Sequence, residues 1–137
     1  MATWSTIEAD ADFMREGNGS FLPTSRYSDS ELITLMQTKA KRKIKTDLIR
    51  ALKLVEDDSD DMTTLDEIVD KYEQEIKMAI AYYQLYLIYY NDESGDGTIT
   101  NERKFDNLAS YNSMKGLFTS FKLDTHVSSK SVSIKLM

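Results

Sequence analysis

The feature that most constrains this chain is residues 78–90, MAIAYYQLYLIYY, an apolar run that only Gln84 interrupts. The residues before the run carry an apolar stripe at helical spacing from Leu65 onward, so the two segments predict one helix over about 64–90. A helix that is apolar on every side is buried on every side, by its own domain or by a neighbouring subunit. The run is shorter than the roughly 20 apolar residues that a membrane-spanning helix requires.

Residues that break helices are rare in the rest of the chain. There is one proline, Pro23, and there are 5 glycines, so long uninterrupted helices are permitted. Ser28 and Glu31 form a capping-box pattern, and the apolar stripe after them predicts a helix over about 29–55. Further apolar residues at helical spacing predict a third helix over about 101–122. The sequence therefore predicts an all-α protein, a small helical bundle of three main helices.

An N-terminal arm, residues 1–27, precedes this helical core domain, which takes in residues 28–122. The start of the arm, MATWSTIEADADF, is acidic and lacks the apolar core of a secretory signal. Four apolar residues of the arm are spaced to share one face of a short helix within residues 1–16, namely Trp4, Ile7, Ala11 and Met14. We therefore expect a short extra helix before the three main ones.

An extended C-terminal tail, residues 123–137, follows the core domain. Val132, Ile134 and Leu136 alternate with polar residues, which is the pattern of a β-strand. The sequence contains no second strand to pair with it, and an isolated strand is not stable in water. We therefore expect the tail to dock on a partner, with these three apolar side chains in pockets of that partner.

The composition excludes several classes of function. The 17 basic and 23 acidic side chains give a net charge of −6, which argues against a free-standing nucleic-acid binder. The chain has no cysteine, which excludes disulfides and cysteine-ligated metals. It has no glycine-rich phosphate loop, nucleophile elbow or zinc-ligand spacing, and its single histidine, His126, has no partner at readable spacing. The sequence therefore predicts a protein that is not an enzyme and that binds no cofactor or metal.

The segment 89–103, YYNDESGDGTITNER, resembles the calcium-binding loop of EF-hand proteins. With Gly97 at the sixth position of such a loop, ligand positions 1, 3, 5, 7 and 9 carry oxygen-bearing side chains, namely Asp92, Ser94, Asp96, Thr98 and Thr100. The twelfth position, which needs a bidentate glutamate, carries Arg103 instead. The other interpretation is an ordinary connection between two helices, and the missing ligand favours it.

Opposite charges are separated along the chain. Residues 39–45, KAKRKIK, concentrate the cations Lys39, Lys41, Arg42, Lys43 and Lys45, whereas residues 56–75 are dominated by acids. The basic stretch is either the solvated face of an amphipathic helix, a surface that faces DNA phosphates, or one half of an electrostatic joint between subunits. Head-to-tail contacts between such patches close into rings when the rotation allows, although the two patches could also pair within one chain.

The tyrosines of the apolar run are a second indication of assembly. A small core cannot easily take in all of Tyr82, Tyr83, Tyr86, Tyr89 and Tyr90, and tyrosine suits interfaces because its ring is apolar and its hydroxyl is polar. We therefore expect Tyr82, Tyr86 and Tyr89 to form an apolar interface. The alternative is a core that is unusually rich in aromatic side chains.

These segments together resemble the head-tail adaptor (connector or head-completion) proteins of tailed bacteriophages. Residues 26–52, RYSDSELITLMQTKAKRKIKTDLIRAL, are similar to the family's first long helix, which begins with a capped, tyrosine-containing turn and ends in basic and aliphatic residues. Residues 67–90, EIVDKYEQEIKMAIAYYQLYLIYY, are similar to its apolar, aromatic second helix. The resemblance is one of pattern and covers about residues 26–121.

The resemblance implies a structural virion protein that is assembled in the host cytoplasm and located in the neck of the virion. Such proteins form a ring, commonly twelvefold, beneath the portal protein, where they extend the DNA channel and dock the next neck or tail component. The resemblance implies contact with packaged DNA that is not sequence-specific, no membrane association and no catalytic residues. Two other interpretations remain open, namely a small cytoplasmic helical regulator that binds a protein partner and a divergent calcium-binding module.

Overall fold

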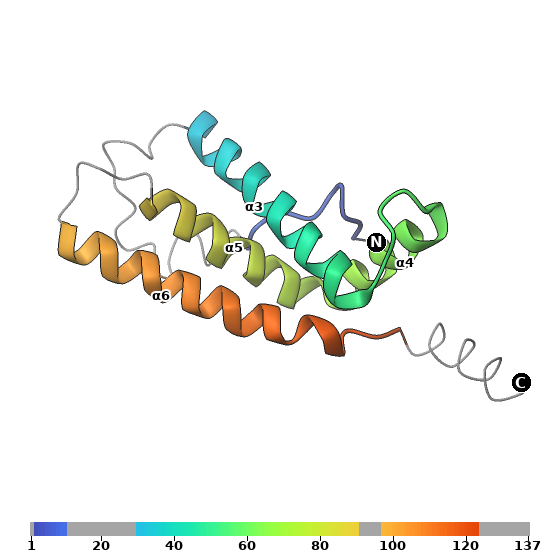
Figure 1. Ribbon diagram of the computed structural model, residues 1–137. Coiled ribbons are helices and arrows are strands. Elements are labelled where there is room, and N and C mark those ends of the chain that lie inside the picture. The colour runs from blue at the N-terminus through green and yellow to red at the C-terminus, as the bar shows by residue number, and fades with distance from the viewer. Residues whose placement is uncertain (1, 11–29, 91–96, 124–137) are drawn as a thin grey trace, which may run out of the picture.

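Three long helices lie lengthwise side by side in the computed structural model, which describes residues 2–10, 30–90 and 97–123 (Figure 1). The central helix α5 runs antiparallel to both of its neighbours, α3 and α6. Their bounds are α3, Ser30–Leu52, α5, Glu73–Tyr90, and α6, Gly97–Gly116. The described residues contain no strand, so the predicted all-α class is confirmed.

Helix α5 is central because its sequence is apolar on most sides. It packs against α3 on one side and against α6 on the other. Its buried residues are Ile76, Ala79, Ile80, Ala81, Gln84, Leu85, Ile88 and Tyr89. The protein's own domain therefore buries most of the apolar run. None of the helices in the described part of the chain has the length and hydrophobicity that crossing a membrane requires.

Helix α3 presents a regular apolar stripe to this centre. Met36, Ala40, Ile44 and Leu48 recur every four residues and are all buried. The helix ends three residues before the predicted end because Lys53 adopts the left-handed conformation, with φ 57°. The Leu54 N–H then donates to the Ile49 carbonyl, which is the hydrogen bond of a Schellman motif.

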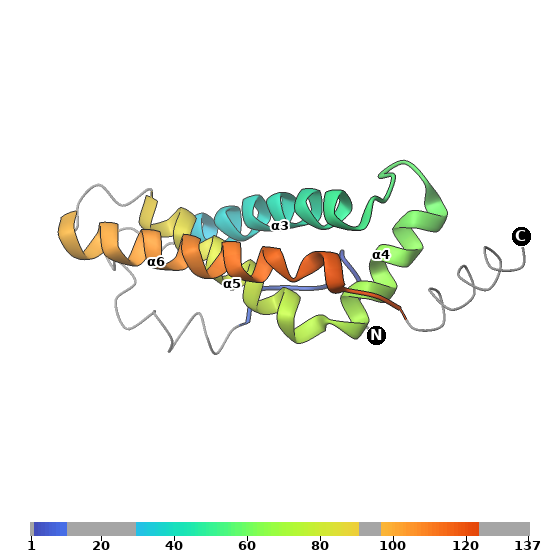
Figure 2. The same ribbon diagram turned by 60° about the horizontal axis from the view of Figure 1, so that its bottom comes forward.

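The prediction of one helix over 64–90 is wrong in two respects. The helical structure begins earlier, at Ser59, and it is divided into two helices. Helix α4, Ser59–Lys71, begins at Ser59 because the Asp58 side chain caps it by accepting from the Asp60 N–H at 3.0 Å. The helical structure is then interrupted at Tyr72, between α4 and α5. Figure 2 shows α4 at one end of the bundle, turned away from the direction of the three long helices.

The break at Tyr72 coincides with a set of contacts to the far end of the chain. The Tyr72 ring stacks on Phe121 with centroids 4.2 Å apart, just after the short 3-10 helix η2, Phe118–Ser120. The Tyr72 hydroxyl donates to the Lys122 carbonyl and accepts from the Lys122 N–H, both at 3.0 Å. Helix α6 and η2 together take the place of the single helix predicted over 101–122.

The short helix predicted within residues 1–16 is wrong for the part that the structure describes. Residues 2–10 form a turn followed by an extended segment, which we call the N-terminal segment. It lies between α3 and the α4–α5 side of the bundle, and its Ile7 and Ala9 are buried (Figure 1). Side chains of the helices accept hydrogen bonds from its backbone, and the Ala9 N–H among these donors is one that a helix over these residues would have used internally.

Candidate interaction surface

An aromatic ladder runs along the packed faces of α5 and α6. We use this name for six successive ring contacts with centroids 4.2–6.4 Å apart, a spacing at which aromatic pairs attract. The rings, in order, are Tyr72, Phe121, Phe118, Tyr111, Tyr83, Tyr86 and Tyr90. The ladder begins at the α4–α5 break and ends at the last residue of α5, so it connects the core to the opposite end of the bundle.

The ladder ends in an exposed aromatic patch, which consists of Tyr86, Tyr90, Lys104 and Phe105. Tyr90 is 61% exposed and Phe105 is 59% exposed. The Lys104 ammonium lies 5.2 Å from the Tyr90 ring centroid and 4.8 Å from that of Phe105, so one cation covers two rings. Large aromatic side chains with a polar handle are the residues that dominate protein–protein contacts.

A buried carboxylate stands beside the middle of the ladder. The Asp47 side chain is 1% exposed, and the Tyr111 hydroxyl donates to its Oδ2. The ammonium groups of Lys43 and Lys115 lie 3.4 Å and 4.0 Å from its Oδ1. Because Asp47 and Lys43 belong to α3 whereas Tyr111 and Lys115 belong to α6, this cluster ties together the two outer helices of the bundle.

The electrostatics of the two tyrosines follow from this position. Burial raises the pKa of the Tyr111 phenol far above its ordinary value, and the hydrogen bond to the Asp47 carboxylate raises it further. Burial also raises the pKa of Tyr83, with smaller contributions from Tyr86 and Asp47. Both phenols therefore stay protonated throughout the neutral range, and Tyr111 acts as a permanent hydrogen-bond donor to the carboxylate.

The N-terminal segment is fixed by acceptors on three helices. Asp70 and Asp66 of α4 each accept a backbone N–H at 2.9 Å, from Ala2 and Trp4 respectively. Gln37 of α3 accepts from the Ala9 N–H at 2.8 Å, and the Lys77 carbonyl of α5 accepts from the Asp10 N–H at 3.3 Å. Two of the acids in the acidic stretch thus bind the backbone of the N-terminal segment of the same chain.

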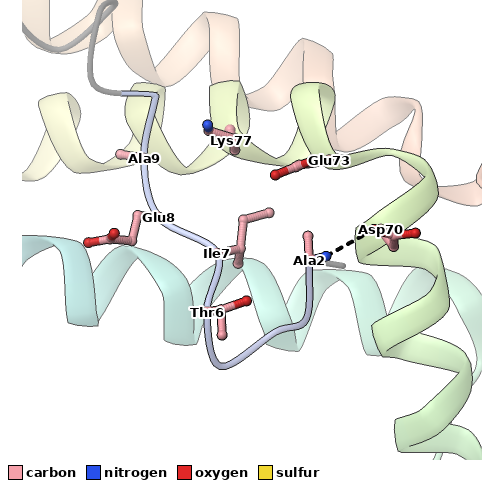
Figure 3. A pocket seen from close by; sticks show the side chains of 8 residues that line it. All are labelled: Ala2, Thr6, Ile7, Glu8, Ala9, Asp70, Glu73 and Lys77. Atoms are coloured by element: carbon pink, nitrogen blue, oxygen red, sulfur yellow. Dashed lines mark hydrogen bonds between the residues drawn. The ribbon is translucent and has the colours of Figure 1, made fainter.

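A cavity of about 500 Å³ lies between the N-terminal segment and the α4–α5 side (Figure 3). Its lining residues are Ala2, Thr6, Ile7, Glu8, Ala9, Asp70, Glu73 and Lys77. Its three carboxylates do not converge, since no described residues form a group of three or more His, Cys, Asp or Glu side chains that could hold a metal ion. The cavity therefore offers no arranged set of ligands.

The structure divides the predicted basic site. The Lys41 ammonium lies 5.5 Å from the Trp4 ring centroid, and burial lowers the pKa of Lys41 while the Glu8 carboxylate partly opposes this effect. Lys43 pairs with Asp47, and Lys45 lies 3.6 Å from Glu56. Lys39 and Arg42 are exposed. The basic stretch is thus not one surface, because three of its cations make contacts within the chain.

The structure also divides the predicted tyrosine interface. Tyr89 is only 3% exposed and belongs to the core, whereas Tyr82 and Tyr86 are half-buried. Tyr90, which the sequence did not single out for the interface, is the most exposed of the run. The periodicity of a helix that is apolar on every side gives no signal that distinguishes these tyrosines.

Two further predictions fall partly or wholly outside the described residues. Residues 91–96 and the tail with Val132, Ile134 and Leu136 are among the residues that the structure does not describe. Helix α6 begins at Gly97, so the second half of the calcium-loop candidate is helical up to Arg103. In an EF-hand loop the backbone carbonyl of the seventh residue coordinates calcium, whereas a helical Thr98 directs its carbonyl along the helix axis.

The chain was compared with protein-family models, curated proteins and solved structures, and none of them matches it.

Proposed function

We propose that this chain is a structural protein of the neck of a tailed-phage virion, a head-tail adaptor that assembles as a ring beneath the portal protein. In this role it extends the DNA channel and docks the next neck or tail component. The observation that carries the proposal is the exposed aromatic patch at the end of the aromatic ladder. Tyr90 and Phe105 keep about three fifths of their surface in solvent, at 61% and 59%, although large aromatic rings normally lie inside a small protein.

The construction of the patch supports a role in assembly. Tyr86 and Tyr90 are extensions of the core, because each successive ring of the ladder rests on the one before it, and the Lys104 ammonium links Phe105 to Tyr90. A partner that covers Tyr90 and Phe105 would therefore meet a surface that is already ordered, which lowers the entropic cost of binding. The helical bundle is consistent with a protein that acts by contact.

The test is binding to the portal protein encoded by the same genome. We expect electron microscopy and mass photometry of the co-expressed proteins to reveal a ring of several copies on the portal. Tyr90→Ser/Phe105→Ser should abolish binding to the portal or to the neighbouring copy while the far-UV circular dichroism spectrum stays the same. Val55→Ser is the matched control, because Val55 is equally exposed, at 58%. It follows the C-terminus of α3, at the opposite end of the bundle from the exposed aromatic patch (Figure 1).

Two results would contradict the proposal. If the wild-type chain stays monomeric beside the portal and binds a different protein in a one-to-one complex, the regulator interpretation replaces it. If the doubly substituted chain still forms rings on the portal, the exposed aromatic patch is not the contact that assembles them.

A further inference from the structure

The outer face of α3 carries a second set of cations, distinct from those that contact the chain itself. Lys39, Arg42 and Arg50 are exposed, and together with Thr46 they recur at intervals of three or four residues. Such spacing places them on one stripe of the helix, which runs about 16 Å from Lys39 to Arg50. None of these cations forms an ion pair with another described residue. We call this stripe the basic ridge.

An acidic stripe of similar spacing lies on α4. Asp60 and Thr63 are exposed, Glu67 is half-buried, and the three are again three and four residues apart. Other acids nearby are already used, since Asp66 and Asp70 hold the N-terminal segment. Asp60 and Glu67 form no ion pair with a described residue. Their charges are therefore left to attract a partner.

We infer that the basic ridge of one copy binds the acidic stripe of α4 in a second copy of this chain. This inference rests on the proposed function, for which it supplies the joint between subunits. The two stripes carry opposite charges, and their residues recur at the same helical intervals of three and four. They lie on different elements, one along the side of the bundle and one at its end (Figure 2). Such a contact is heterologous, and heterologous contacts generate rings when the rotation closes.

A polyanion is a less suitable occupant of the basic ridge. The exposed acidic turn 56–58 begins six residues after Arg50, so a nucleic-acid strand longer than the ridge would run onto like charge. The net charge of −6 repels such a strand at longer range. The acidic stripe spans only about 10 Å from Asp60 to Glu67, so it is shorter than the basic ridge and can end before the turn.

Cross-linking tests the contact directly, because the chain has no cysteine of its own. Thr46→Cys marks the basic ridge and Thr63→Cys marks the acidic stripe, and neither substitution changes a charge. We expect a mixture of the two single variants to form a disulfide-linked heterodimer at low ionic strength. The heterodimer should be lost at about 1 M salt, where the screening length falls to about 3 Å. Preferential formation of either homodimer would overturn the inference.

Charge reversal provides the second readout. Lys39→Glu/Arg42→Glu and Asp60→Lys/Glu67→Lys should each fail to assemble alone. Mixed together, they should assemble into rings in which the two variants alternate, because each mismatched surface then meets its new complement. Asp106→Lys, compared with Glu67→Lys alone, controls for the change in net charge, since Asp106 is exposed on α6, which carries neither stripe.

The outcomes separate the joint from the proposed function. If each reversed variant still forms rings on the portal by itself, the joint is wrong and the adaptor function stands. If even the wild-type chain forms no ring with the portal, the adaptor function fails. If the wild-type chain binds single-stranded DNA and Lys39→Glu/Arg42→Glu does not, the occupant is nucleic acid and the inference is overturned.

Discussion

Removing the hydroxyl of Tyr111 should lower stability more than removing any comparable hydroxyl at the surface. Tyr111→Phe leaves the ring in the aromatic ladder but removes the hydroxyl that donates to the Asp47 Oδ2. The Asp47 side chain is only 1% exposed. Hydrogen bonds to charged groups contribute about 1.5–3 kcal/mol, and a buried acceptor without its donor is not compensated by water. Lys43 and Lys115 still hold the other oxygen, at 3.4 Å and 4.0 Å, so the carboxylate itself stays paired.

We therefore expect Tyr111→Phe to lower the free energy of unfolding by about 2 kcal/mol. For a domain of this size that corresponds to a fall in melting temperature of roughly 8 °C. Urea denaturation followed by far-UV circular dichroism measures the free energy of unfolding. The slope of this free energy against urea concentration should not change. Tyr86→Phe is the matched control, since it removes the hydroxyl from a half-buried ring of the same ladder, and it should cost less than about 0.5 kcal/mol.

A double-mutant cycle with Asp47→Ala identifies the interaction responsible. If the hydroxyl acts through the carboxylate, the two substitutions should be non-additive by about 1–3 kcal/mol. A loss in Tyr111→Phe no larger than that in Tyr86→Phe, or strict additivity in the cycle, would refute the reasoning.

Two further predictions concern pH and the end of α3. Because the pKa of Tyr111 is raised in the folded state, the unfolded chain loses this proton first, near pH 10, so stability falls as the pH rises above about 10, by up to about 1.4 kcal/mol per pH unit. Alkaline melting curves should show a smaller loss in Tyr111→Phe, and an equal loss in both proteins would contradict this assignment. Lys53→Gly should raise the free energy of unfolding by roughly 0.5–1 kcal/mol, because glycine adopts the φ of 57° found there without strain. Calorimetry checks this, with Arg50→Gly inside the helix expected to change stability in the opposite direction.

The class of fold could be predicted from the sequence because its signal is local. The spacing of Met36, Ala40, Ile44 and Leu48 marks one face of a helix without reference to anything else. The break at Tyr72 could not be predicted, since no glycine or proline stands there and the contacts at the break come from Phe121 and Lys122, about 50 residues later in the chain.

The wrong prediction of a helix at the N-terminus has the same cause, namely contacts with residues that are distant in the sequence. Trp4 and Ile7 have helical spacing, but acceptors on α4 take the backbone N–H groups of Ala2 and Trp4 across sequence separations of 68 and 62 residues. The buried carboxylate could not be predicted for this reason as well, because Asp47 lies within a basic helix and its partner Tyr111 is 64 residues away. The tyrosine run could be recognised from the sequence, but which of its rings meet α6 could not.

The docking of the N-terminal segment has a consequence for spectroscopy. Trp4 is the single tryptophan of the protein, and it belongs to a segment that is anchored mainly by side-chain acceptors. Tryptophan fluorescence therefore measures the detachment of this segment, whereas far-UV circular dichroism measures the melting of the helices. The two midpoints coincide only if the segment detaches in the global transition, and a fluorescence midpoint at lower temperature would reveal a separate local opening. A fluorescence melting curve taken alone would then underestimate the stability of the helical bundle.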